Sequence, residues 1–265
     1  MDSNPTCEIT LGSALVSLLD PTPGQEAAFH RWYERDHFYA GVMVGPWFFA
    51  GRRFVATRAM KDLRFPAQTP LLADVRQGSY LALYWILAGH HAAAEAWSIA
   101  QVRELIANDR MLPSRRQAHA GFYHYRGGTF RDADGVPPEL ALDHPYAGVA
   151  LVMSEPSEGS DPATLARWYR EEHLPRVLPG SPVSMCLALE PMPLPPGVPA
   201  YVPRPRGLER STLHVYFLEQ DPRTCWKDVF EPLPRLLQER GLGRITFAAP
   251  FIPTIPGSDR YSDEL

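Results

Sequence analysis

The chain contains one short phrase twice, and this repeat constrains the fold more than any other feature. Residues 31–37 read Arg-Trp-Tyr-Glu-Arg-Asp-His, and residues 167–173 read Arg-Trp-Tyr-Arg-Glu-Glu-His. In both copies a His follows the Tyr by four residues. Self-similarity at so long a period indicates two half-domains of one design. We therefore expect two comparable candidate sites, one in each half.

Hydrophobic patterning predicts the same order of elements in both halves. In the first half we expect strands at 11–19, 47–57, 80–87 and 119–126, and helices at 25–41 and 91–108. In the second half we expect strands at 146–153, 183–190, 212–218 and 244–249, and helices at 162–177 and 226–240. Asp161 and Pro162 fit the N-cap and first position of the helix at 162–177. This order, β-α-β-β-α-β, is the ferredoxin-like signature.

A long irregular segment separates the second and third strands in each half, which supports the duplication independently of the repeated phrase. The one at 191–210 is so rich in proline that it can be neither helix nor central strand. The expected organisation is a first repeat at 1–128, a linker at 129–145, a second repeat at 146–252 and a C-terminal tail at 253–265. The tail either wraps the body or extends into solvent.

Composition argues against several classes of partner. The net charge of −4, without a run of Lys and Arg, argues against nucleic-acid binding. No apolar run approaches the ~18 residues of a membrane span. The three cysteines, Cys7, Cys186 and Cys225, form no CxxC pair, and the N-terminus has no basic and apolar leader. We expect a cytoplasmic protein, a monomer or a homodimer, whose partner is a small molecule.

A β-α-β-β-α-β unit with Trp-Tyr-x-x-x-His late in its first helix resembles the dimeric α+β barrel superfamily, and its EthD-like branch in particular. Leu174-Pro175 follow the second histidine as in that branch, whereas Phe38-Tyr39 depart from it in the first copy. The resemblance implies an α+β fold: two tandem ferredoxin-like repeats packed sheet to sheet as an intramolecular α+β barrel. The superfamily includes cofactor-free monooxygenases, cyclases, isomerases, lyases and haem-using relatives, so the fold leaves the reaction open.

The repeated phrase is suited to acid–base chemistry. On a helix Tyr33 and His37 lie one above the other, on the apolar face that packs against the sheet. A partly desolvated imidazole can act as general acid or base, with Tyr33 as hydrogen-bond donor to an oxyanion. Asp36 is suited to orienting the ring, and Tyr169 and His173 are the counterparts in the second repeat. A structural role would also be duplicated, so the repeat alone does not establish catalysis.

Aromatic residues favour the first half as the working site. Tyr and Trp side chains gather there in numbers that favour a pocket for a flat aromatic ligand, although core packing explains many of them. The candidate substrate-binding residues are Trp32, Trp47, Phe49, Tyr84, Trp85, Tyr123 and Tyr125, with His124 and Arg53 as polar anchors.

Motifs for metals and cofactors are missing from the sequence: it has no HExxH, CxxC, P-loop or GxSxG, and no GxGxxG after a strand. We expect no metal ion and no cofactor, and haem, which needs only one axial His on this fold, is the alternative that the sequence leaves open. The favoured function is a cofactor-independent lyase, isomerase or cyclase that acts on a hydrophobic aromatic or phenolic molecule. The alternatives are a cofactor-free monooxygenase of a phenolic, polyketide-like substrate and a non-catalytic protein that binds an aromatic ligand.

Overall fold

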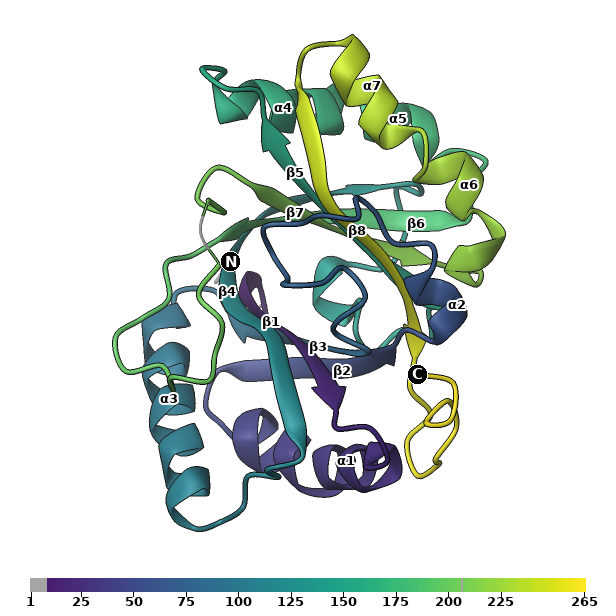
Figure 1. Ribbon diagram of the computed structural model, residues 1–265. Coiled ribbons are helices and arrows are strands. Elements are labelled where there is room, and N and C mark those ends of the chain that lie inside the picture. The colour runs from purple at the N-terminus through teal and green to yellow at the C-terminus, as the bar shows by residue number, and fades with distance from the viewer. Residues whose placement is uncertain (1–8, 206) are drawn as a thin grey trace, which may run out of the picture.

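Eight antiparallel strands close into one barrel, and the helices cover its outside (Figure 1). The computed structural model describes residues 9–205 and 207–265, so Cys7 lies outside the described residues. Around the barrel the strands follow the order β1-β3-β2-β8-β5-β7-β6-β4. Each half contributes four adjacent strands in the ferredoxin-like order. The predicted α+β fold, two ferredoxin-like repeats closed into an intramolecular barrel, is confirmed.

The elements of the first half are β1 (Leu11–Pro21), α1 (Glu26–Trp32), η1 (Tyr33–His37), η2 (Tyr39–Met43), β2 (Phe48–Val55), α2 (Arg58–Lys61), β3 (Tyr80–Leu87), α3 (His91–Ala107) and β4 (Arg115–Phe130). A 3₁₀ turn, η3 (Pro138–Leu140), lies in the connection. The second half contains β5 (Gly148–Pro156), α4 (Pro162–Trp168), η4 (Tyr169–His173), α5 (Leu174–Val177), β6 (Val183–Pro191), β7 (Thr212–Leu218), η5 (Pro222–Thr224), α6 (Trp226–Val229), α7 (Leu233–Glu239) and β8 (Gly243–Pro253).

Strand β3 shows how the sheet separates two layers. Successive side chains of a strand point to opposite faces. Tyr84 faces the helices, where its hydroxyl meets that of Tyr33. Its neighbour Trp85 is fully buried on the other face, and its indole N–H donates to the carbonyl of Pro138 at 3.0 Å. The connection between the halves therefore packs against the barrel side of the sheet.

Several predicted elements differ from the observed ones at their ends. The helix expected at 25–41 is α-helical only to Trp32 and continues as two π-helical turns. The helix expected at 226–240 is split, because Pro232 has no backbone N–H to continue α6. Strand β4 begins four residues earlier and ends four residues later than expected. Asp161 caps α4 as predicted, by accepting the Ala163 N–H at 2.9 Å.

The long insertions of the two halves each pack against the other half. In the first insertion, Phe65 pairs with Ala248 of β8, and the carbonyl of Leu63 accepts the indole N–H of Trp226 at 2.9 Å. In the second, Gly197 lies beside α3, where its carbonyl accepts a hydrogen bond from Arg103 at 3.0 Å. Figure 1 shows this green segment descending along α3.

The C-terminal tail wraps the body, which settles the alternative left open by the sequence. The guanidinium of Arg58 on α2 donates to the carbonyls of Asp263 and Leu265 at 3.1 and 3.0 Å.

Cys186 and Cys225 are buried free thiols. Within 9–205 and 207–265, no helix is long and apolar enough to cross a bilayer.

Candidate active site

A cavity lies between the sheet and the helices of the first half. Its volume is about 120 Å³. Both Tyr33 and His37 of the first repeated phrase line it, and so does Tyr84 from β3. The other walls are mainly apolar and come from β1, β4, α3 and η2: Leu15, Ser17, Gly41, Val42, Ser98, Ile99, Val102, Met111, Arg115, Gln117, Ala120, Gly121 and Phe122.

The roof of this cavity comes from the other half of the chain. Leu194, Val198, Pro199, Tyr201 and Val202 of the proline-rich insertion complete the lining. Between Pro191 and Thr212, the described residues 192–205 and 207–211 form no helix or strand. The prolines of this segment have no backbone N–H and disfavour a regular helix or inner strand, and apolar side chains of the segment still reach the cavity. The first candidate site is therefore built from both halves.

The repeated phrase adopts the same unusual backbone in both copies. In the first, the N–H of Phe38 donates to the carbonyl of Tyr33, five residues earlier. In the second, Leu174 donates in the same way to Tyr169. Such π-helical turns are rare and occur frequently at functional sites. The spacing that the two copies share is therefore accompanied by a π-helical turn, as well as placing Tyr and His on one face of the helix.

His37 is held by two rings and a glycine. Its imidazole stacks on Trp32, with ring centroids 4.6 Å apart and an interplanar angle of 16°, and meets Tyr33 edge to face at 5.1 Å. A Cβ atom at Gly41 would lie 2.8 Å from Cε1 of His37, so the glycine is needed for this approach. Burial, reinforced by Arg115, lowers the pKa of His37 to about 3. The imidazole is therefore neutral at physiological pH.

Two phenols stand beside this imidazole. The hydroxyls of Tyr33 and Tyr84 are 3.1 Å apart. Burial raises the pKa of both tyrosines, so both remain protonated and able to donate. The guanidinium of Arg53 lies 4.3 Å from the ring centroid of Tyr33. Arg53 is only 6% exposed and belongs to the layer behind the cavity.

Arg115 and Gln117, which sequence reasoning missed, supply polar groups to the wall. The guanidinium of Arg115 lies between the rings of Trp32 and Tyr201, at 5.6 and 5.0 Å from their centroids. The amide of Gln117 donates to Ser17 Oγ at 2.9 Å. Among the described residues that line the cavity there is one arginine and no carboxylate. Both residues lie on β4, which begins at Arg115, four residues before the start predicted at 119. They therefore fall outside the predicted strand.

Several predicted site residues lie near the cavity without lining it. Asp36 forms an ion pair with Arg110 rather than bonding to the His37 ring. Trp32 supports His37 from behind, and its indole donates to the carbonyl of Arg110 at 2.9 Å. Arg53 supports the Tyr33 ring in the same indirect way. Trp32 and Arg53 thus contact His37 and Tyr33, whereas Asp36 is paired with Arg110.

The remaining predicted binding residues lie elsewhere. Trp47 is 40% exposed and stacks on His90 at 3.6 Å. Trp85 faces the barrel side, and Phe49 packs against the core. The hydroxyl of Tyr123 bonds to His119 Nε2 at 2.8 Å. Tyr125 and His124 are partly exposed on β4.

The second copy repeats the ring arrangement beside a different cleft. His173 stacks on Trp168 at 4.7 Å and 21°, and meets Tyr169 edge to face at 5.6 Å. Tyr169 lines a cleft between α4 and the sheet of the second half, whereas His173 lies outside its lining. The two histidines of the phrase therefore differ in access to a ligand.

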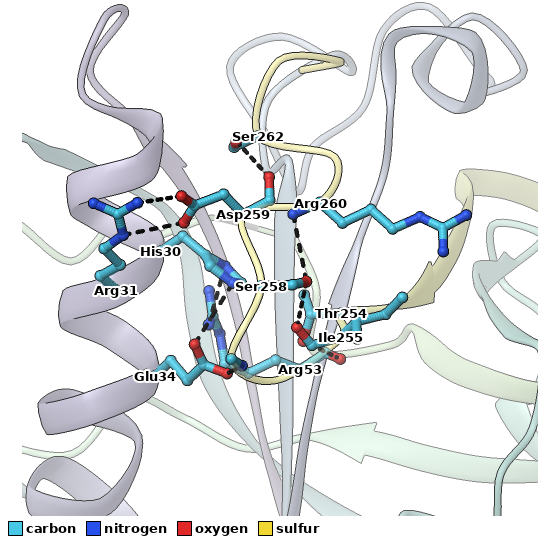
Figure 2. A network of polar contacts seen from close by, with 11 residues as sticks. His30, Arg31, Glu34, Arg53, Thr254, Ile255, Ser258, Asp259, Arg260 and Ser262 are labelled. Carbon is cyan, nitrogen blue, oxygen red and sulfur yellow. Dashed lines mark hydrogen bonds and ion pairs between the residues drawn. The ribbon is translucent and has the colours of Figure 1, made fainter.

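The tail holds the layer behind Tyr33 in place (Figure 2). The Arg53 carbonyl accepts the backbone N–H of Thr254 at 3.1 Å, and its guanidinium lies 3.5 Å from His30 Nδ1. Glu34 accepts the backbone N–H of Gly257, and Asp259 pairs with an arginine of α1. Figure 2 shows these contacts joining the helix of the first phrase to the chain end.

Comparison with known proteins supports the fold. No protein-family model matches the chain, and no curated protein matches it. A solved candidate chlorite dismutase matches with a TM-score of 0.56 and 12% identity, covering 97% of this chain and 100% of that one. An anthrone oxidase-like protein gives 0.51 and 8%, covering 94% and 95%. The encapsulated DyP-type peroxidase of Mycobacterium smegmatis gives 0.51 and 11%, covering 98% and 97%.

These similarities extend over nearly the whole chain at very low identity. They show that the chain shares the fold of these proteins, an α+β barrel. Among the residues that the structure describes, no cluster of three or more His, Cys, Asp or Glu side chains is arranged to hold a metal ion. The shared fold does not define the reaction, which depends on the residues that line the cavity.

Proposed function

We propose that the chain is a cofactor-independent enzyme that transfers protons on a hydrophobic aromatic or phenolic molecule, as a lyase, isomerase or cyclase of the EthD-like type. One observation carries the proposal: a neutral imidazole and two protonated phenols line the same roofed, largely apolar cavity.

In the proposed step the His37 imidazole takes a proton from the substrate, and negative charge develops on a neighbouring substrate oxygen. Tyr33 donates a hydrogen bond to that oxygen, and Tyr84 supports Tyr33. The new anion beside the ring offsets the burial that disfavours imidazolium, so the base becomes stronger as the charge forms. His37 then returns the proton at another position. A general base of this kind contributes roughly 10²–10⁴-fold.

Proton transfer can be measured before the natural substrate is identified. Phenolic ketones and aromatic lactones would be incubated with the protein in D₂O, and deuterium incorporation at carbon followed by mass spectrometry. We expect His37→Gln to reduce exchange by roughly 10²–10⁴-fold and Tyr33→Phe to reduce it less. His124→Gln, on the partly exposed part of β4, is the matched control and should have no effect. Unchanged exchange in both His37→Gln and Tyr33→Phe would refute the assignment.

The second candidate function is cofactor-free monooxygenation of an electron-rich phenol. The apolar, roofed cavity favours it, because a phenolate held there would be shielded from water. A protein described as anthrone oxidase-like shares the fold. Oxygen consumption with a phenolic substrate, in place of deuterium exchange, would favour this reaction. A Soret band in the purified protein would contradict cofactor independence.

A third function, binding without catalysis, would show as an aromatic ligand that raises Tm without turnover.

We further propose that the repeats, 1–128 and 146–252 joined by the linker 129–145, arose by duplication, since both carry the same π-helical turn. We propose a cytoplasmic monomer or homodimer. Size-exclusion chromatography with light scattering would determine the oligomeric state.

A further inference from the structure

The second half carries its own cleft, and its polar groups differ from those of the first cavity. The cleft lies between α4, η4 and the sheet of the second half. No part of the first half's insertion at 56–79 contributes to its lining, so this cleft lacks the kind of roof that covers the first. Its inner wall is formed by Tyr169, Cys186, Ala188 and His214.

The pairing of the strands shows which positions correspond in the two halves. In the first half, Ala82 of β3 pairs with Arg53 of β2. At the matching place in the second half, His214 of β7 pairs with Ala188 of β6. Each pair consists of one large polar residue and one alanine. The large residue is on the second strand of the first half and on the third strand of the second half. Arginine and alanine in the first half are replaced by alanine and histidine in the second.

This exchange preserves one contact and changes its chemistry. In the first half the Arg53 guanidinium covers the Tyr33 ring at 4.3 Å. In the second half the His214 ring covers the Tyr169 ring, with centroids 3.9 Å apart and an interplanar angle of 30°. A permanent cation behind the tyrosine is thus replaced by an imidazole. Because Ala188 is small, the space that Arg53 fills is open, and His214 faces the cleft.

The two rings that face each other in the second half are buried. Tyr169 and His214 are 1% and 2% exposed. His214 Nδ1 has no hydrogen-bond partner within the described part of the chain, and the Tyr169 hydroxyl has only the Ser154 hydroxyl beside it, without the geometry of a good hydrogen bond. Leaving such buried polar groups without a good hydrogen bond destabilises the fold. A ligand that bonds to both would recover this loss.

The rim of the cleft offers no free cation among the described residues. Arg126 bonds to Glu190 at 2.6 Å, and Arg170 bonds to a neighbouring glutamate at 2.7 Å. Arg210 donates to the carbonyls of Ser157 and Ser160 at 3.3 and 2.6 Å. Carboxylates neutralise the charges of Arg126 and Arg170, and the Arg210 guanidinium is already bonded to carbonyl oxygens, so an anionic ligand would have to compete with these contacts. An uncharged ligand avoids that cost.

We propose that this cleft is a second ligand site, separate from the first cavity, that binds an uncharged aromatic molecule carrying both a hydrogen-bond donor and an acceptor. The ligand accepts from the Tyr169 hydroxyl and pairs with Nδ1 of His214, while its ring packs against Leu174 and Ala166. The site does not depend on the proposed reaction in the first cavity.

Benzamide and benzoate form a matched pair of probes, because they share their shape and differ in charge. The full chain, labelled with ¹⁵N at histidine, would be titrated with each and followed by NMR. The His214 resonance would be assigned by its loss in His214→Ala. We expect benzamide to shift this resonance saturably and benzoate to bind more weakly. Tyr169→Phe should weaken benzamide by roughly three- to tenfold, the value of one neutral hydrogen bond.

Two further variants sharpen the test. Tyr33→Phe, in the first cavity, should leave benzamide's effect on His214 unchanged. Ala188→Arg should place a guanidinium where the first half has one, and should abolish benzamide binding. A thermal melt checks that this variant folds. If it does not fold, Tyr169→Phe is the test of the site. The proposal is overturned if benzamide leaves the His214 resonance unmoved, if benzoate binds as tightly, or if Tyr169→Phe binds benzamide as the parent does.

Discussion

The hydroxyl of Tyr33 lies 3.1 Å from the hydroxyl of Tyr84, and both rings line the first cavity. This contact makes Tyr84 a positioning residue for the proposed oxyanion donor. Tyr84→Phe should lower the exchange rate by roughly three- to tenfold, the value of one hydrogen bond, and have little effect on substrate affinity. Separate measurement of kcat and KM tests this. A rise in KM with unchanged kcat would contradict the role of Tyr84.

Gly41 permits the close approach of the His37 ring, since a Cβ atom there would lie 2.8 Å from Cε1. Gly41→Ala should therefore displace the imidazole and lower kcat/KM by up to about 10²-fold, as small misplacements of a reacting group do. Val44→Ala, an exposed position just after η2, is the control. Full activity in Gly41→Ala would show that the ring position is not critical.

The acid limb of the pH profile should reflect the environment of His37. Its pKa is lowered from 6.5 to about 3 by burial and by Arg115, so the neutral, proton-accepting form persists well below neutrality. We expect kcat/KM to stay constant from neutral pH down to the acid limit of the fold. An apparent pKa near 6.5 for an activity that depends on His37 would mean that the ring is solvated in the working enzyme.

Acid should destabilise the fold through its buried histidines. Burial lowers the pKa of His119 to about 4, and those of His173 and His214 to about 4 and 3. Below pH 6.5 the unfolded chain takes up protons that the folded chain excludes, so stability falls as pH falls. Each histidine contributes about 1.4 kcal/mol per pH unit. Urea unfolding between pH 7 and pH 5 should show a shallower decline for His119→Gln than for His144→Gln, a partly exposed control.

The C-terminal tail should stabilise the first half through its combined contacts. The ion pair between Arg31 and Asp259 is exposed, so Asp259→Ala should cost less than about 1 kcal/mol. Deleting residues 255–265 also removes the contacts of Glu34 and Arg58, and should lower Tm clearly more. Equal Tm values for the truncated chain and for Asp259→Ala would show that the tail is only loosely attached.

Much of the fold could be predicted from the sequence, because strand alternation and the repeated phrase are local signals. Tyr33, His37 and Tyr84, which were predicted as site residues, do line one cavity. Trp47 and Trp85 do not, because a rich aromatic composition does not show which face of a strand a residue occupies. The π-helical turns depend on a single shifted backbone bond, which hydrophobic spacing does not reveal.

The roof of the cavity was the hardest part to predict. The sequence predicts an irregular segment at 191–210, but it does not show that Tyr201 and Val198 reach the other half. That contact depends on barrel closure, which brings the insertion of one repeat beside α3 of the other. Long-range placement of this kind follows from topology and leaves no periodic signal.

The crossing of the insertion has a consequence for how such a protein can diversify. Two identical subunits would have to carry identical clefts and identical roofs, so any change in one would appear in both. In a single chain a substitution at Tyr201 alters the first cavity alone, and one at His214 alters the second cleft alone. Because both halves belong to one chain, the lining of each pocket can change separately, while the shared barrel maintains the stability of both.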